Sequence, residues 1–167
     1  YHVTLNDPTS GRPAFISPSS SASPTVGPDG DVYYGVLENP FPNHDDRGWL
    51  LHYDATLTRA KTPGSFGWDN TVSVLPARSV PDYHGTSPYL LVSKYNNYLG
   101  IGPNGDGRNR VAVLDPRASQ KDPYANARVM KAVQTILSPA HVPGEPAGAR
   151  YEWCINSAVV DPADGSV

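Results

Sequence analysis

Short apolar runs alternate with turn-forming residues along much of the chain. The stretch from Ser23 to Val36, SPTVGPDGDVYYGV, has the pattern of a strand, a tight turn and a second strand. In Pro28-Asp29-Gly30, proline presets φ, aspartate bonds to its own backbone, and glycine adopts a positive φ. The following run is β-branched and aromatic, as strands prefer. The pattern predicts a β-hairpin over residues 22–37.

Further apolar runs predict more strands after this hairpin. We expect strands in the following ranges: 48–54, 61–68 (weakened by Pro63), 86–94 and 110–115, with 71–75 as a short strand or crossover. Residues 129–137 remain ambiguous because their apolar positions fit either a helix or a strand. His52 lies within one of these strands, so we expect a hydrogen-bonded structural histidine there.

Three turn-bearing segments suggest an internal repeat. They begin at Ser23-Pro24, Ser87-Pro88 and Ser157-Ala158. Their spacing is longer than the ~40–50 residues of a typical propeller blade. The excess length is assigned to four loops, at 38–47, 76–85, 102–109 and 138–150.

The segments SPTVGPDGDVYYGVL and GWLLHYDATLT resemble a blade of the pyrroloquinoline-quinone-like (quinoprotein-type) β-propellers. In that family a Ser-Pro strand leads through an Asp-Gly turn to a Val-Tyr strand, and a third strand ends in an aspartate, here Asp54 and Asp115. The resemblance implies an all-β fold, a β-propeller segment of four-stranded antiparallel blades within a larger ring. Residues 1–167 would form one partial propeller domain, with blades at 22–75, 86–137 and 154–167, the last incomplete.

The chain departs from the family pattern at several positions. The family's Thr-Gly after the third strand is replaced by Leu57-Thr58 and Arg117-Ala118, and Trp68 could replace the tryptophan that locks successive blades only with a register shift. The paired cysteines of cofactor-using members are absent, since Cys154 is the one cysteine. Because propellers have about 4–8 blades, we expect a fragment, completed by further blades of the same chain or by partner subunits.

Composition and charge narrow the function classes. The net charge of −3 offers no basic field for nucleic acid, and no apolar run approaches the ~20 residues of a membrane helix. A single cysteine makes neither an internal disulfide nor a cysteine-rich metal site. The abundance of Pro, Gly and Tyr suggests a periplasmic or extracellular bacterial protein.

Two polar loops carry candidate binding chemistry. His44, Asp45 and Asp46 place an imidazole beside two carboxylates, which suits ligand binding, metal binding or acid–base work. Asn104, Asp106 and Asn109 offer oxygen ligands resembling those of a calcium loop, but a closing glutamate is missing. For both loops the alternative is a solvated turn. Both follow second strands, so we expect them on one face.

The aromatic residues suggest a further class of site. Trp68 lies near a loop and could either pack in the core or stack against a ligand. We therefore expect an exported binding or scaffold module whose loops recognise a small molecule, sugar or peptide. The alternatives are a pyrroloquinoline-quinone- and calcium-dependent oxidoreductase with catalytic residues outside this chain, and a propeller hydrolase or lyase acting on sugars. Whether the protein is an enzyme stays open.

Overall fold

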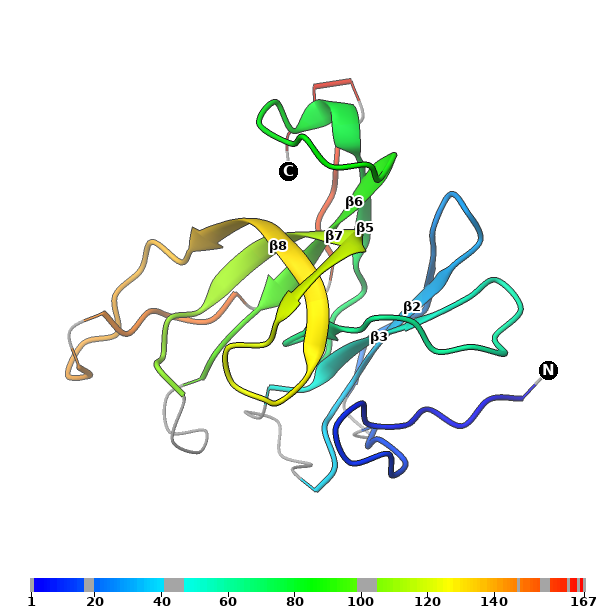
Figure 1. Ribbon diagram of the computed structural model, residues 1–167. Coiled ribbons are helices and arrows are strands. Elements are labelled where there is room, and N and C mark those ends of the chain that lie inside the picture. The colour runs from blue at the N-terminus through cyan, green and yellow to red at the C-terminus, as the bar shows by residue number, and fades with distance from the viewer. Residues whose placement is uncertain are drawn as a thin grey trace.

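The chain folds into two four-stranded antiparallel sheets that follow one another in sequence (Figure 1). The computed structural model describes residues 2–16, 20–40, 47–98, 105–146, 148–153, 157–161, 163–164 and 166. The first sheet runs in the order β1 (Thr25–Val26), β2 (Val32–Val36), β3 (Trp49–Tyr53) and β4 (Gly64–Ser65). The hairpin predicted over 22–37 is confirmed, since β1 pairs with β2 across the Pro28-Asp29-Gly30 turn.

The second sheet has longer strands, and its strands also lie side by side in the order of the sequence. It consists of β5 (Ser73–Pro76), β6 (Tyr89–Tyr95), β7 (Arg110–Lys121) and β8 (Arg128–Leu137). A 3-10 turn, η1 (Ala77–Ser79), follows β5. The all-β class and the four-stranded antiparallel sheets are confirmed. Residues 129–137 form a strand paired along β7, so the helical alternative is wrong. The described residues contain no helix long and apolar enough to cross a membrane.

The strand pairing divides the chain at a different point from the predicted blade ranges. Ser73–Pro76 pairs with Tyr89–Tyr95 rather than with the first sheet, so the second sheet starts at β5. Ser87-Pro88 therefore leads into the second strand of its sheet, whereas Ser23-Pro24 leads into a first strand. Residues 154–156 lie outside the described part, and the described residues after them contain no strand.

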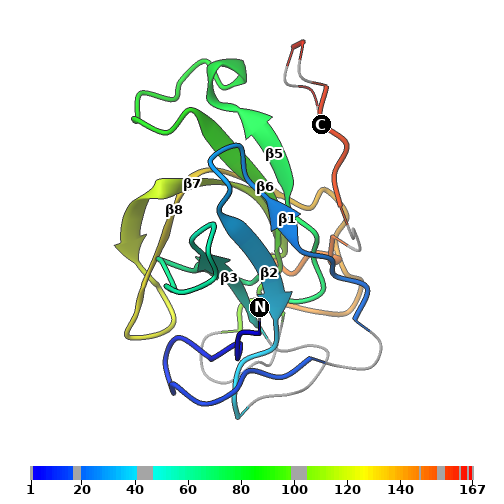
Figure 2. The same ribbon diagram turned by 90° about the vertical axis from the view of Figure 1, so that its right-hand side faces the viewer.

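The two sheets lie face to face (Figure 2), and a shared apolar core joins them. Strand alternation turns Tyr33 and Leu50 of the first sheet toward the second. The second sheet contributes Tyr89, Leu91, Tyr95, Ala112, Leu114 and Met130 to the same cluster. Because both inner faces are apolar, the sheets bury one another's side chains and hold their relative position.

The chain ends cover the two outward faces. On the first sheet, Val3 and Leu5 pack against a cluster that includes Trp49, whose Nε1 donates a 3.0 Å hydrogen bond to Asp7. On the second sheet, Trp153 and Val160 pack against Leu75, Leu90 and Val92, among others. The molecule is therefore layered as amino-terminal segment, first sheet, second sheet and carboxy-terminal segment.

The connection from β4 to β5 passes between the sheets in close contact with the backbone of the first sheet. A Cβ atom added at Gly35 would lie 2.1 Å from the carbonyl oxygen of Gly67, and one at Gly67 would lie 2.3 Å from the nitrogen of Leu50. Farther along, Thr25 Oγ1 donates a 2.8 Å hydrogen bond to the Val72 carbonyl. The crossing segment thus reaches the second sheet by direct contact with the backbone of the first.

Arg47 and Asp122 form a buried ion pair that joins the two sheets. The Arg47 guanidinium donates to both carboxylate oxygens of Asp122, at 3.1 and 2.6 Å. It lies 4.2 Å from the ring centre of Trp49 and 4.9 Å from that of Phe66. Ser65 Oγ also donates to Asp122. Charges buried this way are costly unless both partners stay in place.

Replacing Gly35 by alanine is expected to destabilise the protein by about 2–4 kcal/mol, because the new Cβ meets backbone that cannot rotate away. Gly11→Ala is the control: its φ is +67°, but no atom lies within 4 Å of the added Cβ. The control should cost about 1 kcal/mol from backbone strain alone. Urea denaturation measures both changes, and equal losses would disprove a steric role for Gly35.

The Asp122→Asn substitution is expected to destabilise the fold by about 3–5 kcal/mol at neutral pH, since it leaves the Arg47 charge buried without its partner. Burial raises the pKa of Asp122, but the bonds and charge of Arg47, with further hydrogen bonds from Ser65 and Tyr124, outweigh it and lower the pKa overall.

The stabilisation by Asp122 is therefore complete above the unfolded pKa of about 3.9 and is lost as the pH falls toward the lower folded pKa. The difference in unfolding free energy between wild type and Asp122→Asn should shrink below about pH 4. Asp106→Asn, at a partly exposed carboxylate, should change stability by no more than about 0.5 kcal/mol. A pH-independent difference would contradict this account.

Candidate functional site

The first predicted loop site cannot be placed. His44, Asp45 and Asp46 lie outside the described residues, as does Asn104 of the second loop. Their proposed roles in ligand or metal binding stay predictions.

The two described members of the predicted calcium loop have protein partners. Asp106 accepts hydrogen bonds from Asn97 Nδ2 at 2.8 Å and Arg108 N at 2.9 Å. Asn109 is buried and donates from Nδ2 to the Arg150 carbonyl at 3.0 Å. Over the ranges that the structure describes, no group of three or more His, Cys, Asp or Glu residues is placed to hold a metal ion. Calcium binding therefore stays a prediction.

Trp68 is a core residue in this fold. Only 1% of its surface is exposed, and a Cβ added at Gly48 would lie 2.5 Å from the Trp68 Cβ. Its indole is therefore not presented to solvent as a stacking surface.

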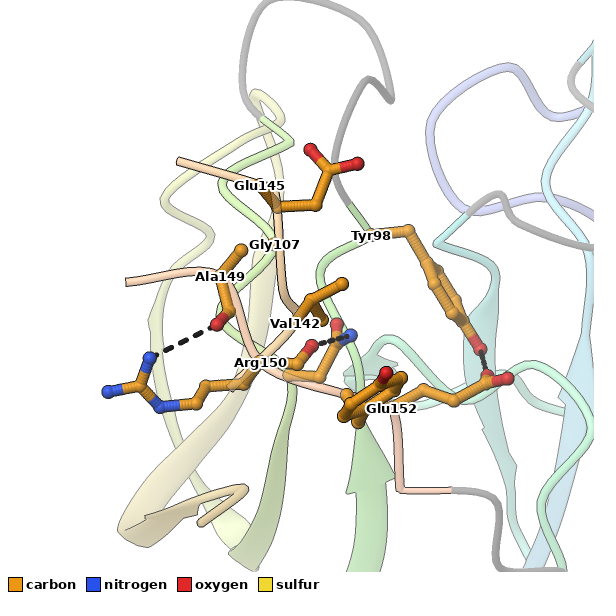
Figure 3. Close-up of a pocket in the computed structure, with 9 residues that line it drawn as sticks. Tyr98, Gly107, Val142, Glu145, Ala149, Arg150 and Glu152 are labelled. Carbon is orange, nitrogen blue, oxygen red and sulfur yellow. Dashed lines mark hydrogen bonds between the residues drawn. The ribbon is translucent and has the colours of Figure 1, made fainter. Parts of the chain in front are cut away.

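Two loops of the second sheet line an open depression of about 360 Å³, the loop pocket (Figure 3). The β6–β7 loop and the chain after β8 line it with Tyr98, Gly107, Asn109, Val142, Glu145, Ala149, Arg150, Tyr151 and Glu152. Its volume is in the range of small-molecule sites.

Backbone hydrogen bonds fix the two loops against each other. Arg150 N donates to the Gly107 carbonyl at 2.9 Å, and Ser138 N donates to the Asn109 carbonyl at 2.9 Å. Asn96 exchanges two 3.2 Å hydrogen bonds with the Trp153 backbone. Segments distant in sequence are thereby joined into one wall at the end of the β6–β7 pair.

The polar side chains of the loop pocket include two carboxylates, those of Glu145 and Glu152. Tyr98 OH donates to Glu152 Oε2 at 2.8 Å, and the Glu145 carboxylate lies farther out along the same loop (Figure 3). The Arg150 side chain extends away from Tyr98 and donates to the Ala149 carbonyl at 3.0 Å (Figure 3). The pocket can therefore accept hydrogen bonds from a ligand.

A second cavity, of about 430 Å³, lies between the sheets beside the β1–β2 turn. We call it the inter-sheet cavity; it is lined by Asp29, Asp31, His52, Lys61, Thr62, Tyr89, Pro116 and Arg117. It gathers charged side chains from both sheets.

His52 is the centre of this charged cluster. Its Nε2 lies 2.8 Å from Asp31 Oδ2, and its Nδ1 lies 3.2 Å from the Thr62 carbonyl oxygen. Lys61 Nζ pairs with the same Asp31 oxygen. The ring stacks on Tyr33 with centroids 4.5 Å apart. The expectation of a hydrogen-bonded structural histidine is confirmed.

A chain of hydroxyls leads from this cluster to the surface. The hydroxyls of Tyr33 and Tyr89 lie 2.6 Å apart, and Tyr89 donates to Asp29 Oδ1 at 2.7 Å. Arg117 pairs with the other Asp29 oxygen at 3.5 Å. Burial raises the pKa of both tyrosines, so both phenols stay protonated at neutral pH. Each carboxylate here has a cationic partner, which indicates a network that joins the sheets.

Sequence reasoning missed the residues that line the loop pocket, except Asn109. The stretch from 138 to 150 shows only the Pro and Gly content of a loop, which does not reveal where it packs. Glu152 stands beside Trp153 in the sequence with no pattern that indicates a partner, and its contact with Tyr98 depends on the folded arrangement.

Comparison with known proteins adds no relative: the sequence matches no family model, no curated protein and no solved structure. The resemblance to quinoprotein-type propellers therefore stays a prediction. Any functional conclusion has to come from the residues themselves.

The pKa of His52 is expected to lie below 6.5, because burial lowers it more than Asp31 raises it. Below pH 6.5 the unfolded chain then binds more protons than the folded one, so stability should fall as the pH drops toward the folded pKa. Asp31→Asn removes a group that raises the pKa and should lower it further.

Titration of the His52 ring protons by NMR measures both shifts. His84→Gln, at an exposed histidine, is the control and should leave the His52 pKa unchanged. A higher His52 pKa in Asp31→Asn would show that the carboxylate does not stabilise the charged ring.

Proposed function

We propose that this chain is part of an exported, propeller-type binding module and that its loop pocket recognises a small ligand. Three kinds of observation support this proposal. They are the repeated course of the chain, the similar turns of its units, and the shape and lining of the loop pocket.

The course of the chain favours consecutive blades. The outer strand β4 connects through the crossing segment to β5, the first strand of the next sheet. Beyond β8, the Ala158 carbonyl accepts a hydrogen bond from Ser73 Oγ of β5. The segment around Ala158 thus lies against β5, where the first strand of a third unit is expected in a propeller.

The turns of the first and last units each contain the same kind of hydrogen bond. Asp29 Oδ1 accepts from Asp31 N at 3.3 Å, and Asp164 Oδ1 accepts from Ser166 N at 2.9 Å. In both cases an aspartate bonds to the backbone two residues on, which is the usual role of this residue in turns. This similarity supports the interpretation of 157–166 as the beginning of another unit.

The loop pocket is the observation that carries the binding function. Loops alone form it, and they are bonded to each other and to the ends of the strands of the second sheet. Binding sites of many folds are built in this way, with loops held by a rigid scaffold. Two tyrosines and several hydrogen-bond acceptors provide both contact area and orientation.

A fragment library of neutral, anionic and cationic small molecules, with simple sugars included, is expected to give hits whose NMR shift changes map to the loop pocket. Tyr151 lines the pocket and is 52% exposed, so Tyr151→Ala should weaken the best hit by about ten-fold without unfolding the protein.

Ile136→Ala is the control, because Ile136 is 48% exposed and does not line the pocket. It should leave the affinity unchanged. Hits that map only elsewhere, or no hits at all, would refute the proposed function.

A further inference from the structure

We propose that the inter-sheet cavity is a second binding site and that it takes a neutral sugar ring. The inference does not depend on the loop pocket, since no residue lines both sites. The cavity volume of about 430 Å³ lies in the range of small-molecule sites. Its side chains combine balanced charge with hydrogen-bonding capacity that the described residues leave unused.

The charges that line the inter-sheet cavity balance one another. Asp29 and Asp31 supply two negative groups, and Lys61 and Arg117 supply two positive ones. Burial holds the pKa of His52 below its usual value, so its ring adds no charge at neutral pH. An anion in the cavity would meet both carboxylates and a cation would meet both basic groups, so the lining favours a neutral molecule.

Both carboxylates keep acceptor capacity. The Asp31 side chain is only 8% exposed, and its described contacts, from His52 and Lys61, both go to Oδ2. The described side-chain atoms that are fully inaccessible and unpartnered do not include Asp31 Oδ1, so this oxygen is open to a molecule in the cavity. Asp29 Oδ2 has one described contact, with Arg117 at 3.5 Å, which is longer than the ~3.2 Å of an ordinary hydrogen bond.

The two basic side chains keep donor capacity. The Lys61 ammonium has three N–H donors, and its described contact is with Asp31 alone. The Arg117 guanidinium has five, and its described contact is the long one to Asp29. Lys61 lies between β3 and β4 of the first sheet and Arg117 lies in β7 of the second. Donors from both sheets can therefore reach one molecule in the cavity.

A sugar fits this combination of donors and acceptors. Each hydroxyl donates one hydrogen bond and accepts up to two, so neighbouring hydroxyls can donate to a carboxylate and accept from a basic group at once. Water can satisfy the same groups, but a sugar replaces several ordered waters by one molecule whose hydroxyls are already held on a rigid ring.

The test uses D-glucose, D-galactose and D-mannose at millimolar concentration and neutral pH, with binding followed by the NMR shifts of His52, Thr62 and Arg117, which line the cavity. At least one of the three sugars is expected to shift these residues. The matched charged probes are the amino sugar and the uronic acid of the sugar that binds best. Both should bind about ten-fold more weakly than the neutral sugar.

The same ring can come from a free sugar or from the end of a glycan. The methyl glycoside of the best sugar separates the two sources, because its anomeric oxygen is blocked as in a glycan. Equal binding of the glycoside identifies a glycan end as a ligand, and loss of binding restricts the site to free sugars.

Arg117→Gln should weaken the best sugar by about ten-fold, because it removes a charged donor. The Arg117 side chain is 47% exposed and its ion pair is long, so this variant should keep the fold. Arg78→Gln, at an exposed arginine that does not line the cavity, is the matched control and should leave the affinity unchanged.

Tighter binding of a charged derivative than of its neutral sugar would overturn the inference, as would an unchanged affinity in Arg117→Gln. No shift of the cavity residues with any of the three sugars would do the same. Sugar-induced shifts confined to Tyr98, Tyr151 and Glu152 would overturn this inference and support the loop pocket instead.

Discussion

The relative position of the two sheets depends on one buried charge interaction. Arg47 precedes β3 and Asp122 follows β7, so their ion pair connects the two sheets. Besides Arg47, the Asp122 carboxylate accepts from the Tyr124 and Ala125 nitrogens, so it also shapes the β7–β8 turn. Because removing either charge would leave the other buried and unpaired, the sheets cannot slide past each other without a large loss of stability.

The rest of the interface follows from this fixed position. The backbone of Met130 in β8 donates to the Pro63 carbonyl at 2.8 Å, which links the outer edges of the sheets. At the β1–β2 turn, Asp29 accepts from the Tyr89 hydroxyl and pairs with Arg117, which forms the second polar link between the sheets. The apolar core lies between these two polar regions. Burial of its side chains holds the two sheets together, and the charged residues set the alignment of one sheet on the other.

Local patterns predicted the local elements and did not predict their partners. The hairpin at 22–37 follows from a turn motif, and the strand at Trp49–Tyr53 follows from an apolar run, so both needed only neighbouring residues. Ser73–Pro76 was ambiguous because its pairing with β6 depends on a crossing that Gly35 permits. The turn-forming residues near Ser87 were also read as a first strand opening, although they lead to a second strand. The loop pocket was missed for the same reason, since its walls meet only through long-range bonds such as Arg150 to Gly107.

Asn109, in the wall of the loop pocket, has a buried side-chain oxygen with no partner among the described residues, because the backbone around it leaves no alternative. The Asn109 carbonyl accepts from Ser138 N, and Arg110, the next residue, begins β7. Its side-chain nitrogen is held by the Arg150 carbonyl, so Oδ1 cannot turn toward solvent without breaking that bond. The second sheet therefore acts as the scaffold that holds the walls of the loop pocket in place.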